Sequence, residues 1–299
     1  MNNRSVIFIP GKNPKPTAEQ HMGLLWRTLL EGVRRAEPEV ADDLANHFKS
    51  FSVTAWNYLY YHEYKKIDQD LSWIDTLINK HGPSENDILD AKAWHRKWIR
   101  FLYSTVDLFP FLLKVMPGEL LSTAEEIKRY FLNQNNIACD IRDILKQQLR
   151  KKLNNNERVL LIAHSMGSVI AYDALWELSH LEHVEGKVDL LTLGSPLGLN
   201  YVQRRLMGNR YAGIKKYPTN IRSWINVSAV GDITSLDRTF ADDYYEMLEL
   251  GIIDNIEDHC DGIYNFFHND EGLNCHRSYG YLVNPAVGKV ISDWWVMAN

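Results

Sequence analysis

Cysteine is scarce in this chain, which argues against a disulfide framework. The 299 residues include 3 cysteines, Cys139, Cys260 and Cys275. Disulfide scaffolds pair their cysteines in even numbers, whereas this number is odd and the chain has no C-x-x-C pair. We therefore expect no disulfide bond to hold this fold together.

Long hydrophobic runs are missing as well. Near the N-terminus the apolar run from Val6 to Ile9 stops at Pro10, which is too short for the apolar core of a secretory signal. No stretch approaches the roughly 18 uninterrupted apolar residues that a membrane-spanning helix needs. Together with the cysteine usage, this predicts a cytoplasmic protein.

An excess of positive charge is also absent. The formal net charge is -5 and the pI is near 6.1, whereas proteins that bind nucleic acid need a basic surface for the phosphates. We therefore expect no nucleic acid partner. The apolar fraction of 45% and the charged fraction of 24% are those of a soluble globular protein, and we expect a single large domain over residues 1–299.

The stretch 158–178 is the most informative part of the chain. Its apolar run at 159–162 is typical of a strand that is buried on both faces of a parallel sheet. A turn of small residues around Ser165 follows, and then residues such as Gly167 and Ala171 recur at helical spacing. A serine on so tight a turn from strand to helix has its hydroxyl exposed above the sheet, which is the position of a nucleophile.

Elsewhere the sequence alternates between strand and helix patterns. Apolar and β-branched runs predict strands at 6–9, 51–56, 188–193 and 221–230, and helical spacing predicts helices from Thr17, over 137–153 and from Pro285 onward. The helical region that begins at Thr17 is expected to close at Pro38. This alternation predicts an α/β fold with a mostly parallel central sheet and helices on both faces. In such sheets, ligands bind beyond the carboxyl ends of the strands.

Residues 62–137 interrupt the alternation. They have a helical pattern with many aromatic residues, and we expect them to form a helical, cap-like insertion. The central part, 101–121, is apolar enough to line an acyl pocket or to make transient contact with a membrane surface. The alternative is that the aromatic residues pack the insertion onto the main domain.

The motif Ala163-His164-Ser165-Met166-Gly167 resembles the G-x-S-x-G nucleophile elbow of α/β-hydrolases, with alanine at the first glycine position. The chain as a whole, apart from the insertion, is similar to α/β-hydrolases of the lipase and esterase type. The similarity rests on four stretches, which are Ile9 to Lys12, the elbow, Leu193 to Leu197, and the loops with Asp232 and His276.

This resemblance implies a role for each residue of a catalytic site. Ser165 would be the nucleophile, His276 the general base and acid, and Asp232 the residue that orients the imidazole. The oxyanion hole would consist of the N–H of Met166 and an N–H from the loop after the first strand. The candidates for that second donor are Gly11 and Lys12, and the candidates for the substrate pocket are Ser195, Pro196 and Leu197.

Other residues compete for two of these roles. Asp237, Asp242 and Asp243 are alternative acids, but they fall in or near a predicted helix, whereas Asp232 follows a strand. His259 and His268 are alternative bases, and His164 is expected to brace the elbow. A metal site is a further alternative, because His259, Cys260, His268, Cys275 and His276 lie within a short stretch. Their spacing matches neither C-x-x-C nor H-E-x-x-H, so we expect no metal and no other cofactor.

Our first hypothesis is therefore a serine hydrolase that cleaves a carboxylic ester through an acyl-enzyme. The aromatic insertion favours apolar acyl chains, as in a lipase or lysophospholipase, and the expected partner is a small ester or lipid. The same fold and residues also support a thioesterase or an acyltransferase. The hypothesis from a different class is a catalytically silent hydrolase scaffold that binds a partner through the insertion.

Overall fold

Six parallel strands form the centre of the molecule. The computed structural model describes residues 3–93, 127–234 and 239–297. Its main sheet has the strand order β2-β1-β3-β4-β5-β6, and every neighbouring pair is parallel. The strands are β1 (Arg4–Ile9), β2 (Phe51–Val53), β3 (Arg158–His164), β4 (Val188–Leu193), β5 (Ile221–Val227) and β6 (Asn255–His259). The prediction of a mostly parallel sheet is therefore confirmed.

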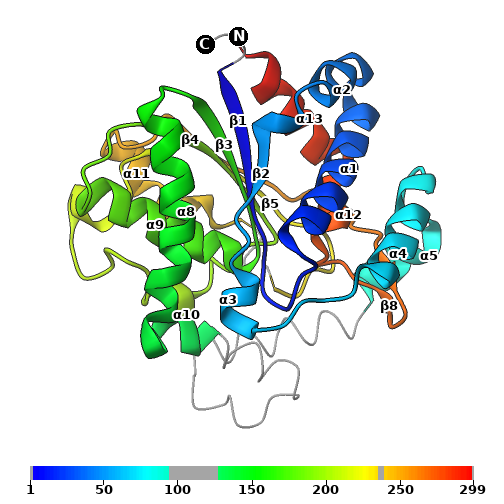
Figure 1. The fold of residues 1–299 in the computed structure, drawn as a ribbon, viewed down its shortest axis with the longest axis horizontal. Helices are drawn as coiled ribbons and strands as arrows, with labels where there is room; N and C mark the ends of the chain where they lie inside the picture. Colours follow the sequence, from blue (N-terminus) through cyan, green and yellow to red (C-terminus); the bar gives the residue numbers. More distant parts are fainter. Residues whose placement is uncertain (1–2, 94–126, 235–238, 298–299) are drawn as a thin grey trace.

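Helices cover both faces of this sheet, as the sequence predicts. In Figure 1, α8 (Ile137–Asn154) and α9 (Met166–His180) lie on one side, and α1 (Ala18–Ala36), α12 (Ser278–Leu282) and α13 (Pro285–Val296) lie on the other. The remaining helices are α2 (Pro38–Ala45), α3 (Asn57–Tyr61), α4 (Ile67–Asn79), α5 (Glu85–Lys92), α10 (Asn200–Gln203) and α11 (Glu246–Glu249). A two-stranded hairpin of β7 (His268–Asn269) and β8 (Gly272–Leu273) stands apart from the sheet.

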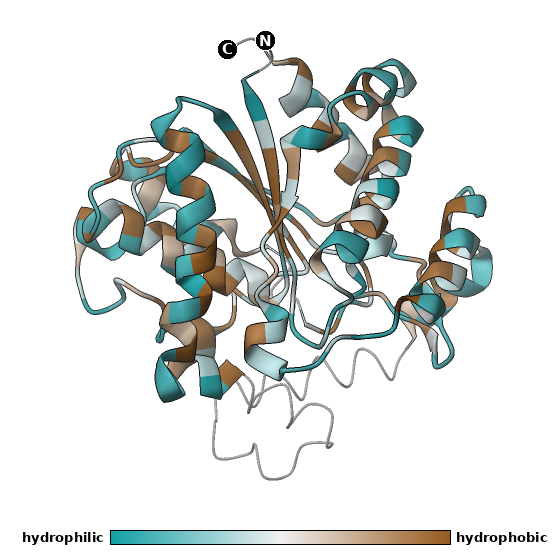
Figure 2. Ribbon diagram, in the orientation of Figure 1, coloured by the Kyte–Doolittle hydropathy of each residue, from teal (hydrophilic) through white to brown (hydrophobic). Residues whose placement is uncertain are grey.

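Alternate residues of the central strands supply two separate hydrophobic layers. In β1, Ile7 and Ile9 pack into the layer that contains α8 and α9, whereas Val6 and Phe8 pack into the layer that contains α1 and α13. A strand buried on both faces has no polar side to turn toward water, which explains its unbroken apolar run. Figure 2 shows this distribution, with hydrophobic strands and helices that are hydrophilic on their outer faces.

The edges of the sheet differ from the sequence prediction. β6 was not predicted, because an edge strand is partly solvated and this one has a single buried apolar residue, Ile256. β2 ends at Val53 and β5 at Val227, each a few residues earlier than the patterns indicated. α1 ends at Ala36, just before Pro38 as predicted, and Pro38 itself begins a further helix, α2, since the first position of a helix needs no N–H.

The described part of the region 62–137 includes α4 and α5. Ile74 and Leu77 of α4 pack into the layer that contains α1 and α13. The apolar central part at 101–121, for which we considered contact with an acyl chain or a membrane, lies outside the described residues. Within the described ranges, no helix is both long and apolar enough to cross a membrane.

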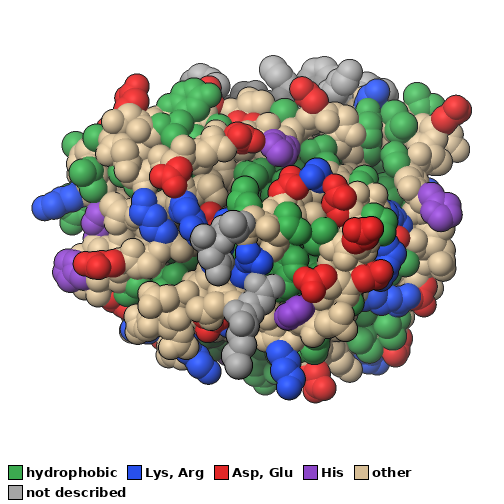
Figure 3. Space-filling view, turned by 90° about the horizontal axis from the view of Figure 1, so that it is seen from above, with side chains coloured by type: hydrophobic (Ala, Val, Ile, Leu, Met, Phe, Trp, Pro, Cys, Tyr) green, Lys and Arg blue, Asp and Glu red, His purple; other side chains and the backbone are tan. Residues whose placement is uncertain are grey.

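Both termini lie at the end of the molecule where β1 begins (Figure 1). Figure 3 looks onto this end, where acidic and basic side chains are interspersed over the visible face. Because all six strands are parallel, their carboxyl ends meet at the opposite end of the sheet. The candidate functional residues lie at those carboxyl ends.

Candidate active site

Ser165 occupies the turn between β3 and α9 in a strained backbone conformation. β3 ends at His164, α9 begins at Met166, and Ser165 between them has φ 54° and ψ -127°. A residue with a side chain in this sparsely populated conformation costs about 1–3 kcal/mol, and such strain tends to cluster at functional sites. Its main-chain N–H donates to the carbonyl of Leu193 in β4 at 3.0 Å, which ties the turn to the sheet.

Close packing explains why the elbow and the neighbouring loop have glycine at two positions. A Cβ on Gly167 would come within 2.5 Å of the carbonyl oxygen of Ile9, so α9 can approach the end of β1 only with glycine there. A Cβ on Gly11 would come within 2.7 Å of the Cβ of Ser165. The loop after β1 therefore passes directly beside the serine.

A continuous chain of hydrogen bonds joins Ser165, His276 and Asp232. The Nε2 of His276 lies 2.8 Å from the Oγ of Ser165, and its Nδ1 lies 2.9 Å from Oδ2 and 3.1 Å from Oδ1 of Asp232. Because the carboxylate accepts the proton on Nδ1, the neutral imidazole has its free lone pair on Nε2, facing the serine hydroxyl. The structure thus brings together three side chains from distant parts of the sequence.

Asp232 is fully buried, and its carboxylate has further donors. The hydroxyl of Tyr281 donates to Oδ2 at 2.6 Å, and the N–H of Thr234 donates to Oδ1 at 2.8 Å. Burial alone raises the pKa of Asp232, but His276 and these hydrogen bonds outweigh burial and hold the pKa below its ordinary value. The carboxylate is therefore ionised at neutral pH. Sequence reasoning missed Tyr281, because no local pattern relates it to Asp232.

His164 lies against His276. The two rings are 4.8 Å apart between centres, and the Nε2 of His164 donates to the main-chain oxygen of His276 at 2.7 Å. Burial, and to a lesser extent the charge of His276, lowers the pKa of His164 well below its ordinary value. The imidazole of His164 is therefore neutral at pH 7 and carries its proton on Nε2.

The candidate oxyanion donors lie at two positions beside Ser165. Met166 is the first residue of α9, so the helix offers no internal acceptor for its N–H. The close contact at Gly11 places the loop with Gly11 and Lys12 against Ser165. Both loops therefore bring main chain to within reach of a group bound at the serine.

An open apolar cavity borders Ser165, with about 460 Å³ of free space when the solvent at its mouth is included. Its lining includes Trp56, Tyr60, Tyr130, Met166, Ile170 and Pro196. Trp56 follows β2 at the carboxyl end of the sheet, where ligand-binding loops are expected. Of the three predicted pocket residues, Pro196 lines this cavity. Ser195 instead shares a hydrogen bond of 2.7 Å with Ser168, and Leu197 is buried in the core.

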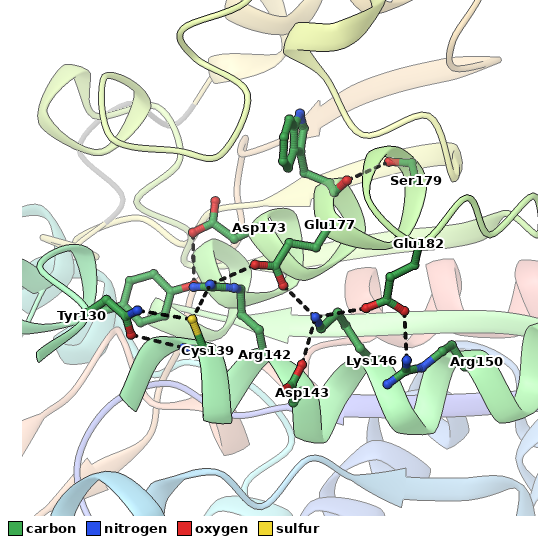
Figure 4. A network of polar contacts seen from close by, with 12 residues as sticks. Tyr130, Cys139, Arg142, Asp143, Lys146, Arg150, Asp173, Glu177, Ser179 and Glu182 are labelled. Carbon is green, nitrogen blue, oxygen red and sulfur yellow. Dashed lines mark hydrogen bonds and ion pairs between the residues drawn. The ribbon is translucent and has the colours of Figure 1, made fainter. Parts of the chain in front are cut away.

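A buried polar network supports one wall of this cavity. The hydroxyl of Tyr130 donates to Asp173 at 3.0 Å, and the N–H of Met207 donates to the other oxygen of Asp173 at 2.8 Å. Burial raises the pKa of Asp173 to about 6. Figure 4 shows how the network continues between α8 and α9, where Arg142 and Lys146 both pair with Glu177 at 2.8 Å. The ring of Tyr130 is therefore held by hydrogen bonds as well as by packing.

The competing residues lie elsewhere in the described structure. The Nε2 of His259 in β6 lies 3.1 Å from Glu257, and the Nε2 of His268 in β7 lies 3.3 Å from Asp87. Asp242 and Asp243 belong to the 3-10 helix η5 (Phe240–Tyr244), and Asp237 lies outside the described residues. Within the described ranges, no three His, Cys, Asp or Glu side chains gather as a metal site requires.

Part of the chain is similar to a known protein family. Residues 127–269 match the family model described as a PGAP1-like alpha/beta domain. The matched segment includes the elbow and Asp232 and ends before His276. No curated protein and no solved structure matches the chain.

Proposed function

Because the chain belongs to the α/β-hydrolase superfamily of serine hydrolases, we propose that it cleaves a carboxylic ester through an acyl-enzyme intermediate. The observation that carries this proposal is the position of His276, whose two ring nitrogens lie 2.8 Å from the Oγ of Ser165 and 2.9 Å from Asp232. Proton transfer from the serine requires this arrangement.

In the first half of the reaction, the Oγ of Ser165 attacks the ester carbonyl and its proton passes to the Nε2 of His276. Asp232, ionised and buried, stabilises the imidazolium that results. The N–H of Met166 and an N–H of Gly11 or Lys12 would stabilise the negative charge on the carbonyl oxygen. The bond to the alcohol oxygen then breaks, and His276 returns the proton to that oxygen.

In the second half, water attacks the acyl-enzyme while His276 accepts its proton. Collapse of the second tetrahedral intermediate breaks the bond to Oγ, and the proton on His276 returns to the serine. The products are a carboxylic acid and an alcohol, and the enzyme is regenerated. No cofactor takes part in this scheme.

The apolar cavity supports an apolar acyl group as the acid part of the ester. Among the described residues that line it, Lys12 is the one charged side chain that could pair with a polar acid. Burying one methylene group there contributes roughly 0.8 kcal/mol. We expect kcat/KM to rise with acyl length in a series of 4-nitrophenyl esters until the cavity is filled. A preference for the shortest ester would contradict the apolar acyl proposal.

A fluorophosphonate probe tests the nucleophile. The wild type should be labelled and Ser165→Ala should not, and equal labelling of both would reject the proposal. His276→Ala and Asp232→Asn should lower kcat by about a thousandfold or more. His259→Ala and His268→Ala are the matched controls, because these histidines pair with Glu257 and Asp87 instead of Ser165.

Our proposal keeps the domain organisation and location that the sequence suggests. These are a single domain over 1–299, an insertion at about 62–137 that contacts lipid transiently, and a place in the cytoplasm. The location is supported by the three cysteines, all of which are free thiols. A single cooperative unfolding transition in urea would agree with one domain, and two separate transitions would contradict it.

A further inference from the structure

A second cleft also borders Ser165, and its lining is polar and basic. It measures about 400 Å³ and is lined by Lys12, Lys15, His164, Asn274, His276 and Arg277, among others. None of the described residues that line it carries a carboxylate. We call it the basic cleft. Ser165 and Lys12 line both this cleft and the apolar cavity. His276 lines the basic cleft but not the apolar cavity.

The position of His276 decides which part of an ester faces the basic cleft. Its Nε2 must deliver a proton to the alcohol oxygen as that oxygen departs. The alcohol part therefore leaves on the side of Ser165 where His276 lies. The acyl part then extends into the apolar cavity, next to Met166. The basic cleft is consequently the binding site of the alcohol part.

Positive charge exceeds negative charge around this cleft. The carboxylate of Asp70 is fully buried and is shared by two cations, with Lys65 at 2.7 Å and Arg277 at 2.9 Å. Lys15 donates to the carbonyl of Lys12 at 2.6 Å and has no ion pair within the described structure. Burial, followed by the positive charge of Arg277, lowers the pKa of Lys15 well below its ordinary value. An anion bound beside Lys15 would offset both effects.

Arg277 also has hydrogen-bonding capacity to spare. Its ion pair with Asp70 uses one terminal nitrogen, and its buried Nε has no hydrogen-bond partner among the described residues. The side chain is 21% exposed and borders the cleft. A guanidinium that neighbours one carboxylate can bind a second anion through its remaining donors.

We infer that the alcohol part of the ester carries an anionic group, a phosphate or a carboxylate, and that Lys15 and Arg277 bind it in the basic cleft. This inference rests on the proposed function. It defines the substrate as an ester with two different ends, an apolar acyl chain and a negatively charged alcohol. The products are a carboxylic acid and an anionic alcohol, with the proton on the alcohol oxygen supplied by His276.

The test compares esters that share one acyl chain. We would measure kcat/KM for a 1-acylglycerol, for the corresponding 1-acylglycerol 3-phosphate, and for the same acyl ester of glyceric acid. The wild type should prefer the phosphate and carboxylate esters to the neutral ester by roughly tenfold or more, as expected for a charge-assisted hydrogen bond. Preference for one anion over the other identifies which group the cleft binds. Equal rates for all three esters, or a faster neutral ester, would overturn the inference.

Variants assign the preference to the basic cleft. In Lys15→Gln, the ratio of kcat/KM for the phosphate ester to that for the neutral ester should fall by about tenfold. Arg277→Lys keeps the charge but loses the planar donor geometry, and should lower the ratio by a smaller factor. Lys289→Gln is the matched control for charge, because Lys289 pairs with Asp293 and Glu37 away from this cleft. An unchanged ratio in Lys15→Gln would also overturn the inference.

The salt dependence of the wild-type enzyme provides a further test that needs no variant. Added NaCl should raise KM for the phosphate ester and leave KM for the neutral ester nearly constant, because salt screens an ionic contact. Equal salt dependence of the two esters would contradict the inference. Loss of the proposed function itself would look different, since no ester in the series would then be cleaved and the fluorophosphonate probe would not label Ser165.

Discussion

The Nε2 of His164 donates to the main-chain oxygen of His276 at 2.7 Å, and the two rings lie tilted at 36° to each other with their centres 4.8 Å apart. The residue before the candidate nucleophile therefore holds the backbone of the candidate base. His276 lies in a loop between β8 and α12, so this contact supplies rigidity that a regular element does not. The ring of His276 is also positioned by Asp232 at its Nδ1.

We predict that His164→Leu lowers kcat/KM by about tenfold, because it removes the hydrogen bond to the main chain of His276. His164→Gln keeps an N–H donor on a side chain of similar reach and should retain more of the activity. Steady-state kinetics with a 4-nitrophenyl ester, together with the urea midpoint of each variant, separates lost positioning from lost stability. Equal activity of the two variants would contradict a positioning role for His164.

Tyr281→Phe should weaken the support of Asp232. The hydroxyl donates to Asp232 at 2.6 Å and accepts the N–H of Ala229 at 3.0 Å, so its removal leaves that buried N–H unsatisfied. We expect kcat to fall by about tenfold and the free energy of unfolding to fall by about 1–3 kcal/mol. Tyr279→Phe is the control, since Tyr279 is also buried but its hydroxyl contacts Asp70. If Tyr279→Phe lowered kcat by the same factor, the result would contradict a specific role for Tyr281 in supporting Asp232.

Gly194→Ala should disrupt the contact between Asp232 and His276. Gly194 has φ 54°, and a Cβ there would lie 2.7 Å from Oδ2 of Asp232 and 3.1 Å from Nδ1 of His276. Gly213→Ala is a matched control, because Gly213 has φ 60° and a Cβ there would have no atom within 4 Å. Both changes add backbone strain of about 1 kcal/mol or more. The kcat of the folded protein should fall in Gly194→Ala but not in Gly213→Ala. Similar kcat values for the two variants would contradict this steric argument.

Asp173→Asn should change how stability depends on pH. The folded pKa of about 6 lies above the ordinary value of 3.8, so the folded chain binds more protons than the unfolded chain between these values. Wild-type stability due to this group therefore falls as the pH rises through about 6. Relative to wild type, Asp173→Asn should gain on the order of 1 kcal/mol between pH 5 and pH 7. Urea denaturation at both pH values measures this gain, and a constant difference would show that Asp173 does not titrate as described.

Local patterns in the sequence were sufficient to predict the five strands β1 to β5 and the elbow. The runs at 159–162 and 188–193 are apolar because both of their faces are buried, and Gly167 is small because α9 meets the end of β1 there. Burial on both faces and close packing of one helix affect neighbouring residues along a single element. They therefore produce a pattern of apolar or small residues that can be recognised in the sequence. β6 has no such sequence pattern, because it lies at the edge of the sheet and Ile256 is its only buried residue.

The site depended on contacts between distant parts of the chain. The order of residues along the chain and their positions at strand ends limited the candidates for the catalytic acid and base to a few residues. Only the fold showed that His276 lies beside Ser165 and that His268 lies beside Asp87. Tyr281 and Gly194 carry no motif, since what matters is the space and the hydrogen bond that each provides at Asp232.

The sequence by itself thus determined the class of fold and the kind of reaction to test, because both depend on local periodicity and on one tight turn. The tertiary structure alone decided what surrounds the reacting groups. It formed the apolar cavity and the basic cleft, both of which border Ser165. The physical reason is that Lys15 and Arg277 lie at opposite ends of the chain. Their charges come to one place only when α1 and α12 pack on the same face of the sheet.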